Sequence, residues 1–266
     1  MPDHAVTWLF VPGDRPQRFA TAAAAGADAV ILDLEDAVAA EAKELARGHV
    51  AQWLAQGGRG WVRINASTTP WYDDDLTAVG GLPGLAGVVV PKAEQAEELQ
   101  ELRERLLPGA GVVALVESAL GLYRSLDLAA AADRLAFGSI DFAADLGAEH
   151  TWDALLVARS TLVLSSRLAG IAAPIDGVTT AVRDEPALAG DVAAARSLGF
   201  TGKLCIHPAQ VHAAAAGFAP SPADLDWARR VVAAVGSGAP GALTVDGAMV
   251  DRPIIERAHR ILRRSP

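Results

Sequence analysis

One unit repeats eight times along this chain of 266 residues and limits the folds that the chain can adopt. Each unit is a short apolar run, followed by a polar turn and an alanine-rich stretch typical of a helix. The runs lack strict alternation of apolar and polar residues, as expected for strands buried on both faces. The predicted strands are Thr7–Pro12, Ala29–Leu34, Gly60–Asn65, Gly87–Pro91, Gly111–Glu117, Arg134–Gly138, Ala172–Asp176 and Gly202–Ile206.

Helical stretches between these strands complete the eight units. They are predicted at Pro16–Ala25, Ala39–Gln56, Trp71–Val79, Ala93–Leu106, Gly121–Ala132, Trp152–Ala169, Asp184–Leu198 and Pro208–Ala216. Eight strand-then-helix units predict an α/β fold with a closed (β/α)8 barrel, the TIM barrel. A doubly wound open sheet shows the same alternation and is the competing fold. The count of eight, and the polar residues directly after the strands, favour the barrel.

Residues 221–266 depart from this repeat, so we divide the chain into a catalytic barrel domain, 1–220, and a C-terminal helical extension, 221–266. The extension contains a predicted helix near Ala223–Val235, a Gly/Pro-rich linker at 236–242, a short run at Leu243–Val245 and a last helix near Pro253–Arg264. Because it follows the eighth unit, we expect it to act as a lid or an oligomerisation element.

Charge and cysteine content exclude several classes of function. The chain has 23 basic and 32 acidic residues and a net charge of −9, so no long-range field would attract nucleic acid or an anionic membrane. Its single cysteine, Cys205, excludes an intramolecular disulfide and a cysteine-cluster metal site. No apolar stretch approaches the roughly 18 residues of a membrane span, and the first residues lack the features of a signal peptide, so we expect a cytoplasmic protein. Neither a G-x-S-x-G sequence nor a P-loop is present, which argues against a serine hydrolase and against a nucleotide-dependent enzyme.

Charged side chains follow many of the predicted strands, where the active site of such a barrel lies. Glu117 and Asp141 are one unit apart, so their carboxylates should lie at the same end of neighbouring strands. Two carboxylates without a His or Cys cluster suit Mg²⁺, which binds one or two carboxylates and keeps several waters. Glu35 and Asp36, after the second strand, are candidates for hydrogen-bonding the waters of that metal. Helix capping is the alternative for all four residues.

A basic group accompanies these carboxylates. Arg63 lies inside an apolar strand, where a guanidinium needs an anionic partner. We favour a substrate carboxylate held by both arms of the guanidinium; a structural salt bridge to Glu35 or Asp36 is the alternative. Arg15 and Lys92 belong to a basic rim at the predicted mouth, which is either a binding site for a phosphate-bearing ligand or ordinary solvated charge.

Eight sequence blocks follow one another over nearly the whole chain: Leu9–Phe19, Ala29–Val38, Val62–Asn65, Val90–Lys92, Val116–Ala119, Gly138–Phe142, Ile206–Pro208 and Gly247–Pro253. Together they resemble the citrate lyase β-subunit-like proteins of the HpcH/HpaI aldolase/citrate lyase family, which are related to malyl-CoA and citramalyl-CoA lyases. The loop at 146–151 is short where the larger malyl-CoA lyases carry an insertion, which disfavours malyl-CoA itself as the substrate.

The resemblance implies a lyase that depends on Mg²⁺, or on Mn²⁺ in its place, and that acts on a thioester of coenzyme A. Such an enzyme cleaves or forms a 3-hydroxy-carboxyacyl thioester of the citramalyl, malyl, citryl or hydroxymethylglutaryl type. The products are a 2-oxo acid and an acetyl thioester. The alternatives are a metal-dependent aldolase on free 2-oxo acids, and a subunit of a citrate lyase complex acting on an acyl-carrier-protein thioester.

The resemblance also implies roles for individual residues. It places metal ligands at Glu117 and Asp141, carboxylate binding at Arg63 and coenzyme A contacts at Phe10 and Arg15, to which the basic rim adds Lys92. It gives Asp251 a catalytic role in the C-terminal lid of a neighbouring subunit, so a homotrimer or a dimer of trimers is expected. A helix N-cap ahead of Pro253 is the alternative for Asp251. The expected catalytic set is Asp251, Arg63, Glu35 and Asp36.

Overall fold

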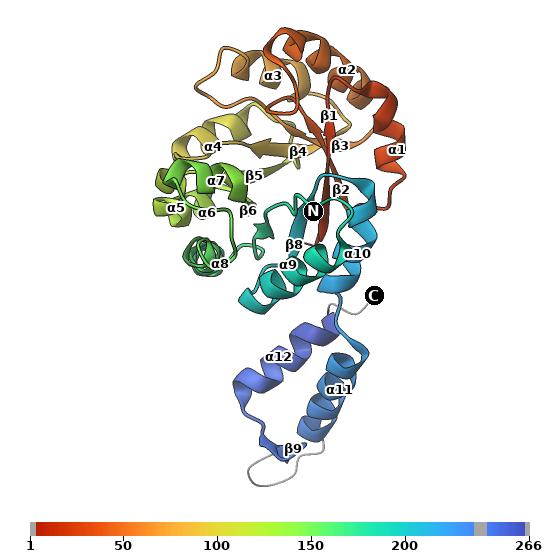
Figure 1. Cartoon of the computed structure of the whole chain (residues 1–266), viewed down its shortest axis with the longest axis vertical. Helices are drawn as coiled ribbons and strands as arrows, with labels where there is room; N and C mark the ends of the chain where they lie inside the picture. The colour runs from red at the N-terminus through yellow and green to blue at the C-terminus, as the bar shows by residue number, and fades with distance from the viewer. Residues whose placement is uncertain (1–3, 237–243, 264–266) are drawn as a thin grey trace. The chain divides into compact units, whose positions relative to one another are not determined.

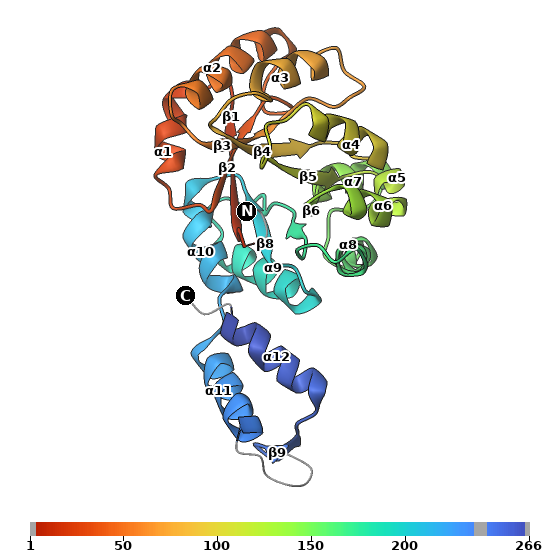
Figure 2. The same cartoon turned by 180° about the vertical axis from the view of Figure 1, so that it is seen from behind.

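Eight parallel strands close into a barrel in the computed structural model, which describes residues 4–236 and 244–263. Neighbouring strands follow chain order, and the eighth strand pairs with the first (Figures 1 and 2). The strands are β1 (Thr7–Pro12), β2 (Ala29–Asp33), β3 (Gly60–Arg63), β4 (Leu85–Val90), β5 (Gly111–Val116), β6 (Arg134–Phe137), β7 (Ile175–Asp176) and β8 (Gly202–Cys205). The predicted (β/α)8 barrel is confirmed, and the open sheet is wrong.

Helices connect these strands along the outside of the barrel (Figures 1 and 2). They are η1 (Pro16–Arg18), α1 (Phe19–Ala23), η2 (Ala40–Ala42), α2 (Lys43–Ala55), α3 (Tyr72–Val79), α4 (Ala96–Glu104), α5 (Ala119–Tyr123), α6 (Ser125–Ala131), α7 (Ser139–Leu146), α8 (Leu156–Ala169), α9 (Glu185–Leu198) and α10 (Pro208–Phe218). No helix within the described ranges is long and apolar enough to cross a membrane.

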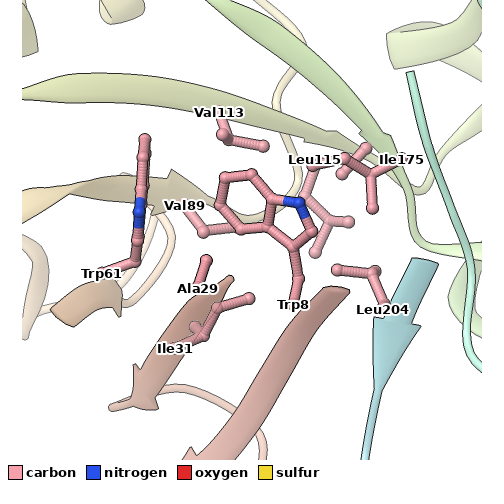
Figure 3. Close-up of a cluster of buried hydrophobic side chains, with 10 residues drawn as sticks. Trp8, Ala29, Ile31, Trp61, Val89, Val113, Leu115, Ile175 and Leu204 are labelled. Carbon is pink, nitrogen blue, oxygen red and sulfur yellow. The ribbon is translucent and has the colours of Figure 1, made fainter. Parts of the chain in front are cut away.

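Aromatic and branched side chains fill the barrel interior (Figure 3). The rings of Trp8 and Trp61 meet edge to face, with their centroids 4.9 Å apart. Gly87 and Gly111 make room for the Trp61 indole, because an added Cβ would lie 2.4 and 2.5 Å from its ring. Each large apolar side chain buried in this way contributes roughly 1.5–3 kcal/mol to folding. The filled interior leaves the ends of the strands as the place for a ligand.

Strand β7 is shorter than the predicted Ala172–Asp176, because it pairs only through Ile175 and Asp176. Pro174 directly before it has no N–H to donate to a neighbouring strand. A buried ionic network reinforces this short strand. Asp176 accepts from Lys203 Nζ and from Arg159 Nε, both at 2.8 Å.

The helices differ from the prediction in two places. The single helix expected at Gly121–Ala132 is two helices, α5 and α6, which meet at Arg124. Helix α7 occupies Ser139–Leu146, where no helix was predicted. Asp141 therefore lies in the first turn of a helix.

The chain divides into two compact units, 1–217 and 218–266. The second unit contains α11 (Pro222–Gly236), a hairpin of β9 (Thr244–Val245) and β10 (Ala248–Met249), and α12 (Arg252–Arg263). Its own small core consists of Ala228, Val231, Val245, Val250 and Ala258. The linker predicted at 236–242 lies, beyond Gly236, outside the described residues. The role of this unit as a lid or an oligomerisation element stays a prediction.

Candidate active site

A cavity of about 330 Å³ lies where the barrel strands end. Its volume falls within the range of small-molecule sites. The lining residues come mostly from the last strand positions or the first positions after them: Phe10, Pro12, Asp33, Asp36, Ala37, Arg63, Leu115, Glu117, Phe137, Gly138, Ser139, Ile140, Asp141, Val178, Leu204 and Ile206. Five predicted site residues thus share one cavity: Phe10, Asp36, Arg63, Glu117 and Asp141.

A larger hollow of about 650 Å³ lies near the amino-terminal ends of β2 to β4. Trp53, Arg59 and Asp28 are among its lining residues. Barrels of this type place their chemistry at the carboxyl ends of the strands. We therefore assign the active site to the smaller cavity, which also contains the convergent charged side chains.

Arg63, the last residue of β3, faces three carboxylates: those of Asp33, Glu35 and, 3.9 Å from its Nη1, Asp36. Its Nε and Nη2 donate to Oδ1 and Oδ2 of Asp33 at 2.7 and 2.6 Å, and its Nη1 lies 3.0 Å from Oε2 of Glu35. The Phe10 ring stacks on the guanidinium, 4.8 Å from Cζ. Burial lowers the pKa of Arg63, but the negative charges of Asp33, Glu35 and Glu117 raise it by more than burial lowers it. The guanidinium therefore stays charged. The ion pair with Glu35 is therefore present, and Asp33 adds a two-pronged pair.

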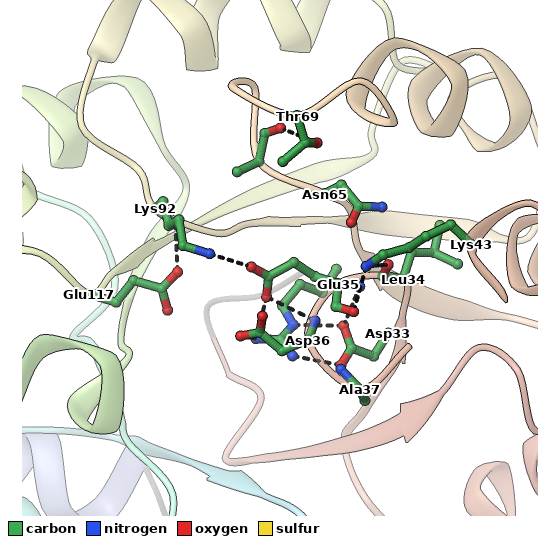
Figure 4. A network of polar contacts seen from close by, with 12 residues as sticks. Asp33, Leu34, Glu35, Asp36, Ala37, Lys43, Asn65, Thr69, Lys92 and Glu117 are labelled. Atoms are coloured by element: carbon green, nitrogen blue, oxygen red, sulfur yellow. Dashed lines mark hydrogen bonds and ion pairs between the residues drawn. The ribbon is translucent and has the colours of Figure 1, made fainter. Parts of the chain in front are cut away.

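Lys92 connects two buried carboxylates (Figure 4). Its Nζ donates to Glu35 Oε1 at 2.7 Å, and its backbone N–H donates to Glu117 Oε1 at 2.7 Å. The φ of Lys92 is +48°, a left-handed conformation that costs energy for a residue with a Cβ. This strained turn directs the N–H of Lys92 at Glu117. Burial raises the pKa of Glu35 above its ordinary value, although Arg63 and Lys92 oppose the shift.

Glu117, directly after β5, is only 3% exposed. Burial, and then the charge of Glu35, raise its pKa to about 8, with a smaller contribution from Asp141. The Lys92 N–H and Arg63 favour the charged form without compensating fully. At neutral pH the Glu117 carboxyl therefore retains its proton, and a bound cation would favour its charged form.

The donor set at Glu117 and Asp141 fits Mg²⁺. Both side chains line the cavity, and both offer the carboxylate oxygens that this cation prefers. Gly138 makes room for the Glu117 carboxylate, because an added Cβ would lie 2.5 Å from its Oε2. In the part of the chain that the structure describes, no group of three or more His, Cys, Asp or Glu could hold a metal ion. A Mg²⁺ site here would thus combine two protein carboxylates with water and substrate oxygens.

The loop after β2 is fixed from inside the protein by Lys43, the first residue of α2. Its buried Nζ donates to the carbonyl oxygens of Leu34 and Glu35, both at 2.7 Å (Figure 4). The carboxylate of Asp33 accepts the N–H groups of Glu35 and Ala37 at 3.0 and 3.2 Å. The loop that carries Glu35 into the site is therefore rigid.

The other predicted residues, Glu35, Arg15, Lys92 and Asp251, are not among those that line the cavity. The side chain of Arg15 is 55% exposed and faces Asp14 at 3.6 Å, and the side chain of Lys92 is half-exposed. Asp251 belongs to the second unit, where its Oδ1 accepts from the Ile254 N–H at 3.1 Å at the start of α12. The expected helix cap at Asp251 is present, and its catalytic role stays a prediction.

Two features of the site were not predicted from the sequence. Asp33 follows four apolar residues of β2 and was assigned no role, although an acid after an apolar run suggests a buried partner. The apolar residues Val178, Leu204 and Ile206 also line the cavity. No sequence signal separates them from ordinary core residues.

A charged cavity at the carboxyl end of a closed barrel defines the class of this protein as a (β/α)8-barrel enzyme. The chain belongs to the HpcH/HpaI aldolase/citrate lyase family, whose model matches residues 7–208, and it is a lyase of that family. The predicted family membership is confirmed.

Similar proteins cover nearly the whole chain. A citrate lyase subunit beta-like protein of Deinococcus radiodurans is 39% identical over 277 residues, covering 96% of this chain and 95% of the relative. A (3S)-malyl-CoA thioesterase of Cereibacter sphaeroides strain KD131 is 33% identical over 268 residues, covering 97% and 93%. Among solved structures, the protein CitE of Mycobacterium tuberculosis with magnesium, acetoacetate and coenzyme A matches with a TM-score of 0.88 and 38% identity. That match covers 100% of this chain and 99% of the other.

Proposed function

We propose that this protein is a Mg²⁺-dependent carbon–carbon lyase that cleaves, or in reverse forms, a 3-hydroxy-carboxyacyl thioester of coenzyme A. The products are acetyl-CoA and a 2-oxo acid or, from a hydroxymethylglutaryl thioester, a 3-oxo acid. The observation that carries this proposal is the convergence of Glu117, Asp141 and Arg63 in one cavity at the strand ends. A similar protein binds magnesium, acetoacetate and coenzyme A together, which supports the same ligand set here.

Glu117 and Asp141 would hold the cation. When bound there, Mg²⁺ stabilises negative charge on the oxygens of the reacting group by several kcal/mol. Because the pKa of Glu117 is raised to about 8, binding of the cation at neutral pH would release the proton of this carboxyl group.

Arg63 orients the substrate carboxylate. Its Nε and Nη2 each donate to Asp33 and its Nη1 faces Glu35, which leaves at least one N–H on each terminal nitrogen. These two N–H groups form the fork that a carboxylate accepts. Because Asp33 and Glu35 already fix the guanidinium, the fork is in place before the substrate binds.

Cleavage requires that the 3-hydroxyl group lose its proton. Asp36 lines the cavity, and its side chain is 58% exposed. We propose that its carboxylate accepts the proton of the 3-hydroxyl group. Glu35 is buried against Arg63 and Lys92, so it positions these cations. As the hydroxyl oxygen becomes a carbonyl oxygen, the C–C bond breaks and its electron pair passes to the acetyl-thioester carbon.

Asp251 would give that carbon its proton. The resemblance implies that a neighbouring subunit supplies this aspartate, so we propose a homotrimer or a dimer of trimers. Phe10, Arg15 and Lys92 would contact the coenzyme A part of the substrate. The side chain of Arg15 is 55% exposed and can approach phosphates, whereas Lys92 is half-exposed and its Nζ is held by Glu35.

The test is mass spectrometry of the purified protein with citramalyl-, malyl-, citryl- and hydroxymethylglutaryl-CoA, with Mg²⁺ or with EDTA. We expect release of acetyl-CoA from at least one thioester with Mg²⁺, and none with EDTA. Glu117→Ala and Asp141→Ala should abolish both Mg²⁺ binding and turnover. If Mg²⁺ binds and no thioester is cleaved, the proposal is wrong. A free 2-oxo-acid aldolase or a carrier-protein-dependent subunit would then replace it.

A further inference from the structure

The charged side chains of the active-site cavity lie on one part of its circumference, with the apolar Leu115, Phe137 and Ile140 among them. These charged side chains come from β2, β3, β5 and β6 and the segments directly after them, and they are Asp33, Asp36, Arg63, Glu117 and Asp141. Phe10, Val178, Leu204 and Ile206 come from β1, from β8 and from the residues directly after β7 and β8. These strands are neighbours in the closed barrel, so we call these four residues the apolar arc.

Apart from the proposed Mg²⁺, the cavity lining provides positive charge for one substrate carboxylate. Among the described residues that line it, Arg63 is the only lysine or arginine. Asp33 and Glu35 already occupy part of its guanidinium, which leaves one fork of N–H groups for a ligand.

The nearby cations are committed elsewhere. Lys203 and Arg159 each lie 2.8 Å from Asp176, and neither lines the cavity. Lys92 Nζ is paired with Glu35. A second carboxylate placed against the apolar arc would be buried without a partner, which is strongly unfavourable.

We propose that the preferred substrate carries one carboxylate, and a methyl group on the carbon that bears the hydroxyl. In the bound substrate Arg63 holds the carboxylate, and Val178, Leu204 and Ile206 contact the methyl group. Citramalyl and hydroxymethylglutaryl thioesters have this pattern. Citryl thioesters carry a second carboxylate, and malyl thioesters have hydrogen in place of the methyl group. This inference rests on the proposed lyase function and narrows its substrate.

The first test is the ratio of kcat/KM values for the four coenzyme A thioesters with Mg²⁺. One methyl group in an apolar pocket changes kcat/KM by roughly 10- to 200-fold, so the malyl thioester should fall behind by about that factor. The citryl thioester should be slower by about 100-fold or more, because its extra carboxylate is unpaired. A preference for citryl- or malyl-CoA overturns the inference and leaves the lyase function standing. Silence with all four overturns both.

A binding measurement tests the apolar arc without turnover. Calorimetric titration with Mg²⁺ present would compare pyruvate with glyoxylate, which lacks the methyl group, and with freshly dissolved oxaloacetate, which has a second carboxylate. We expect pyruvate to bind about tenfold or more tighter than either. Equal or tighter binding of oxaloacetate contradicts the inference, whichever thioester is cleaved.

Ile206→Arg places a second cation on the apolar arc. Ile206 is 40% exposed, so the longer side chain can reach solvent and the fold should tolerate it. We expect the ratio of pyruvate to oxaloacetate affinity to shift by about tenfold or more toward oxaloacetate, because the added guanidinium pairs with the second carboxylate. Leu164→Arg, at an exposed position of α8 outside the cavity lining, is the matched control and should keep the wild-type ratio. An unchanged ratio in Ile206→Arg contradicts the assignment, and the wild-type ratio is decisive if the variant does not fold.

Discussion

At Glu117, burial and two neighbouring carboxylates disfavour the charged form in the same direction. The pKa rises from 4.5 to about 8, so between these values the unfolded chain is ionised at this position and the folded chain retains its proton. A group with a raised carboxyl pKa costs stability as pH increases through that window. The carboxylate that suits a cation site thus lowers the stability of the protein without the cation.

Replacing Glu117 by Gln should therefore stabilise the metal-free protein. In EDTA at pH 7.5 we expect a gain of about 1–3 kcal/mol that shrinks toward zero as the pH falls to about 4.5. Added Mg²⁺ should raise the melting temperature of the wild type and leave E117Q unchanged, because only the wild type binds it. Thermal unfolding at several pH values measures both effects. Glu149→Gln, at an exposed position, is the control. A less stable E117Q in EDTA would contradict the buried-charge explanation.

The pairing of Arg63 with Asp33 shows why residue partners are hard to read from sequence. The two side chains are 30 positions apart and meet because Asp33 and Arg63 are paired in the register of β2 and β3. The sequence indicates that Arg63 needs an anion, but several acids follow the second strand. Only the register of the two strands selects Asp33.

At the scale of elements, the start of α7 joins the fold to the site. Gly138 precedes this helix and lies against Glu117, while Asp141 occupies the first helical turn. The helix therefore holds one proposed metal ligand and, through Gly138, makes room for the other. A change at this point should affect metal binding more than folding.

Gly138→Ala tests that expectation. The added Cβ would lie 2.5 Å from both Cβ and Oε2 of Glu117, so the Glu117 side chain must shift. We expect Mg²⁺ affinity to fall about tenfold or more while the helical circular dichroism spectrum is retained. Gly48→Ala in α2, where nothing lies within 4 Å of the new Cβ, should keep Mg²⁺ affinity and gain about 0.5–1 kcal/mol in stability. Equal Mg²⁺ affinity in G138A and the wild type would mean that Gly138 does not set the position of Glu117.

Most elements of the barrel could be predicted from sequence, because strands buried on both faces form unbroken apolar runs. The limits have physical causes. Strand β7 pairs with its neighbours through two residues only, and an ionic network around Asp176 adds to its stability. The partners in that network are distant in sequence, so no local pattern reveals them. Helix α7 was missed because Gly138 and Asp141 are also typical of loops. The apolar arc was not predicted because Val178 and Leu204 are of the same residue types as the side chains that fill the core.

At the scale of the whole molecule, the proposed mechanism divides its residues between two compact units. Glu117, Asp141 and Arg63 belong to the barrel unit, and Asp251 belongs to the C-terminal unit. If Asp251 acts in a neighbouring subunit, an active site requires an intact barrel from one chain and an intact C-terminal unit from another. Two inactive variants could then restore activity when they share an oligomer.

Mixing E117Q with D251N tests this division. In oligomers assembled at random from equal amounts, about one site in four would combine Glu117 of one chain with Asp251 of another, so about a quarter of wild-type turnover should return. Co-expression followed by a turnover assay measures it. A mixture of E117Q with D141N is the matched control and should stay inactive, because every barrel then lacks one carboxylate. If the E117Q and D251N mixture is equally inactive although the chains co-purify, Asp251 does not act across subunits. If D251N alone retains full turnover, the proton that completes cleavage comes from another group.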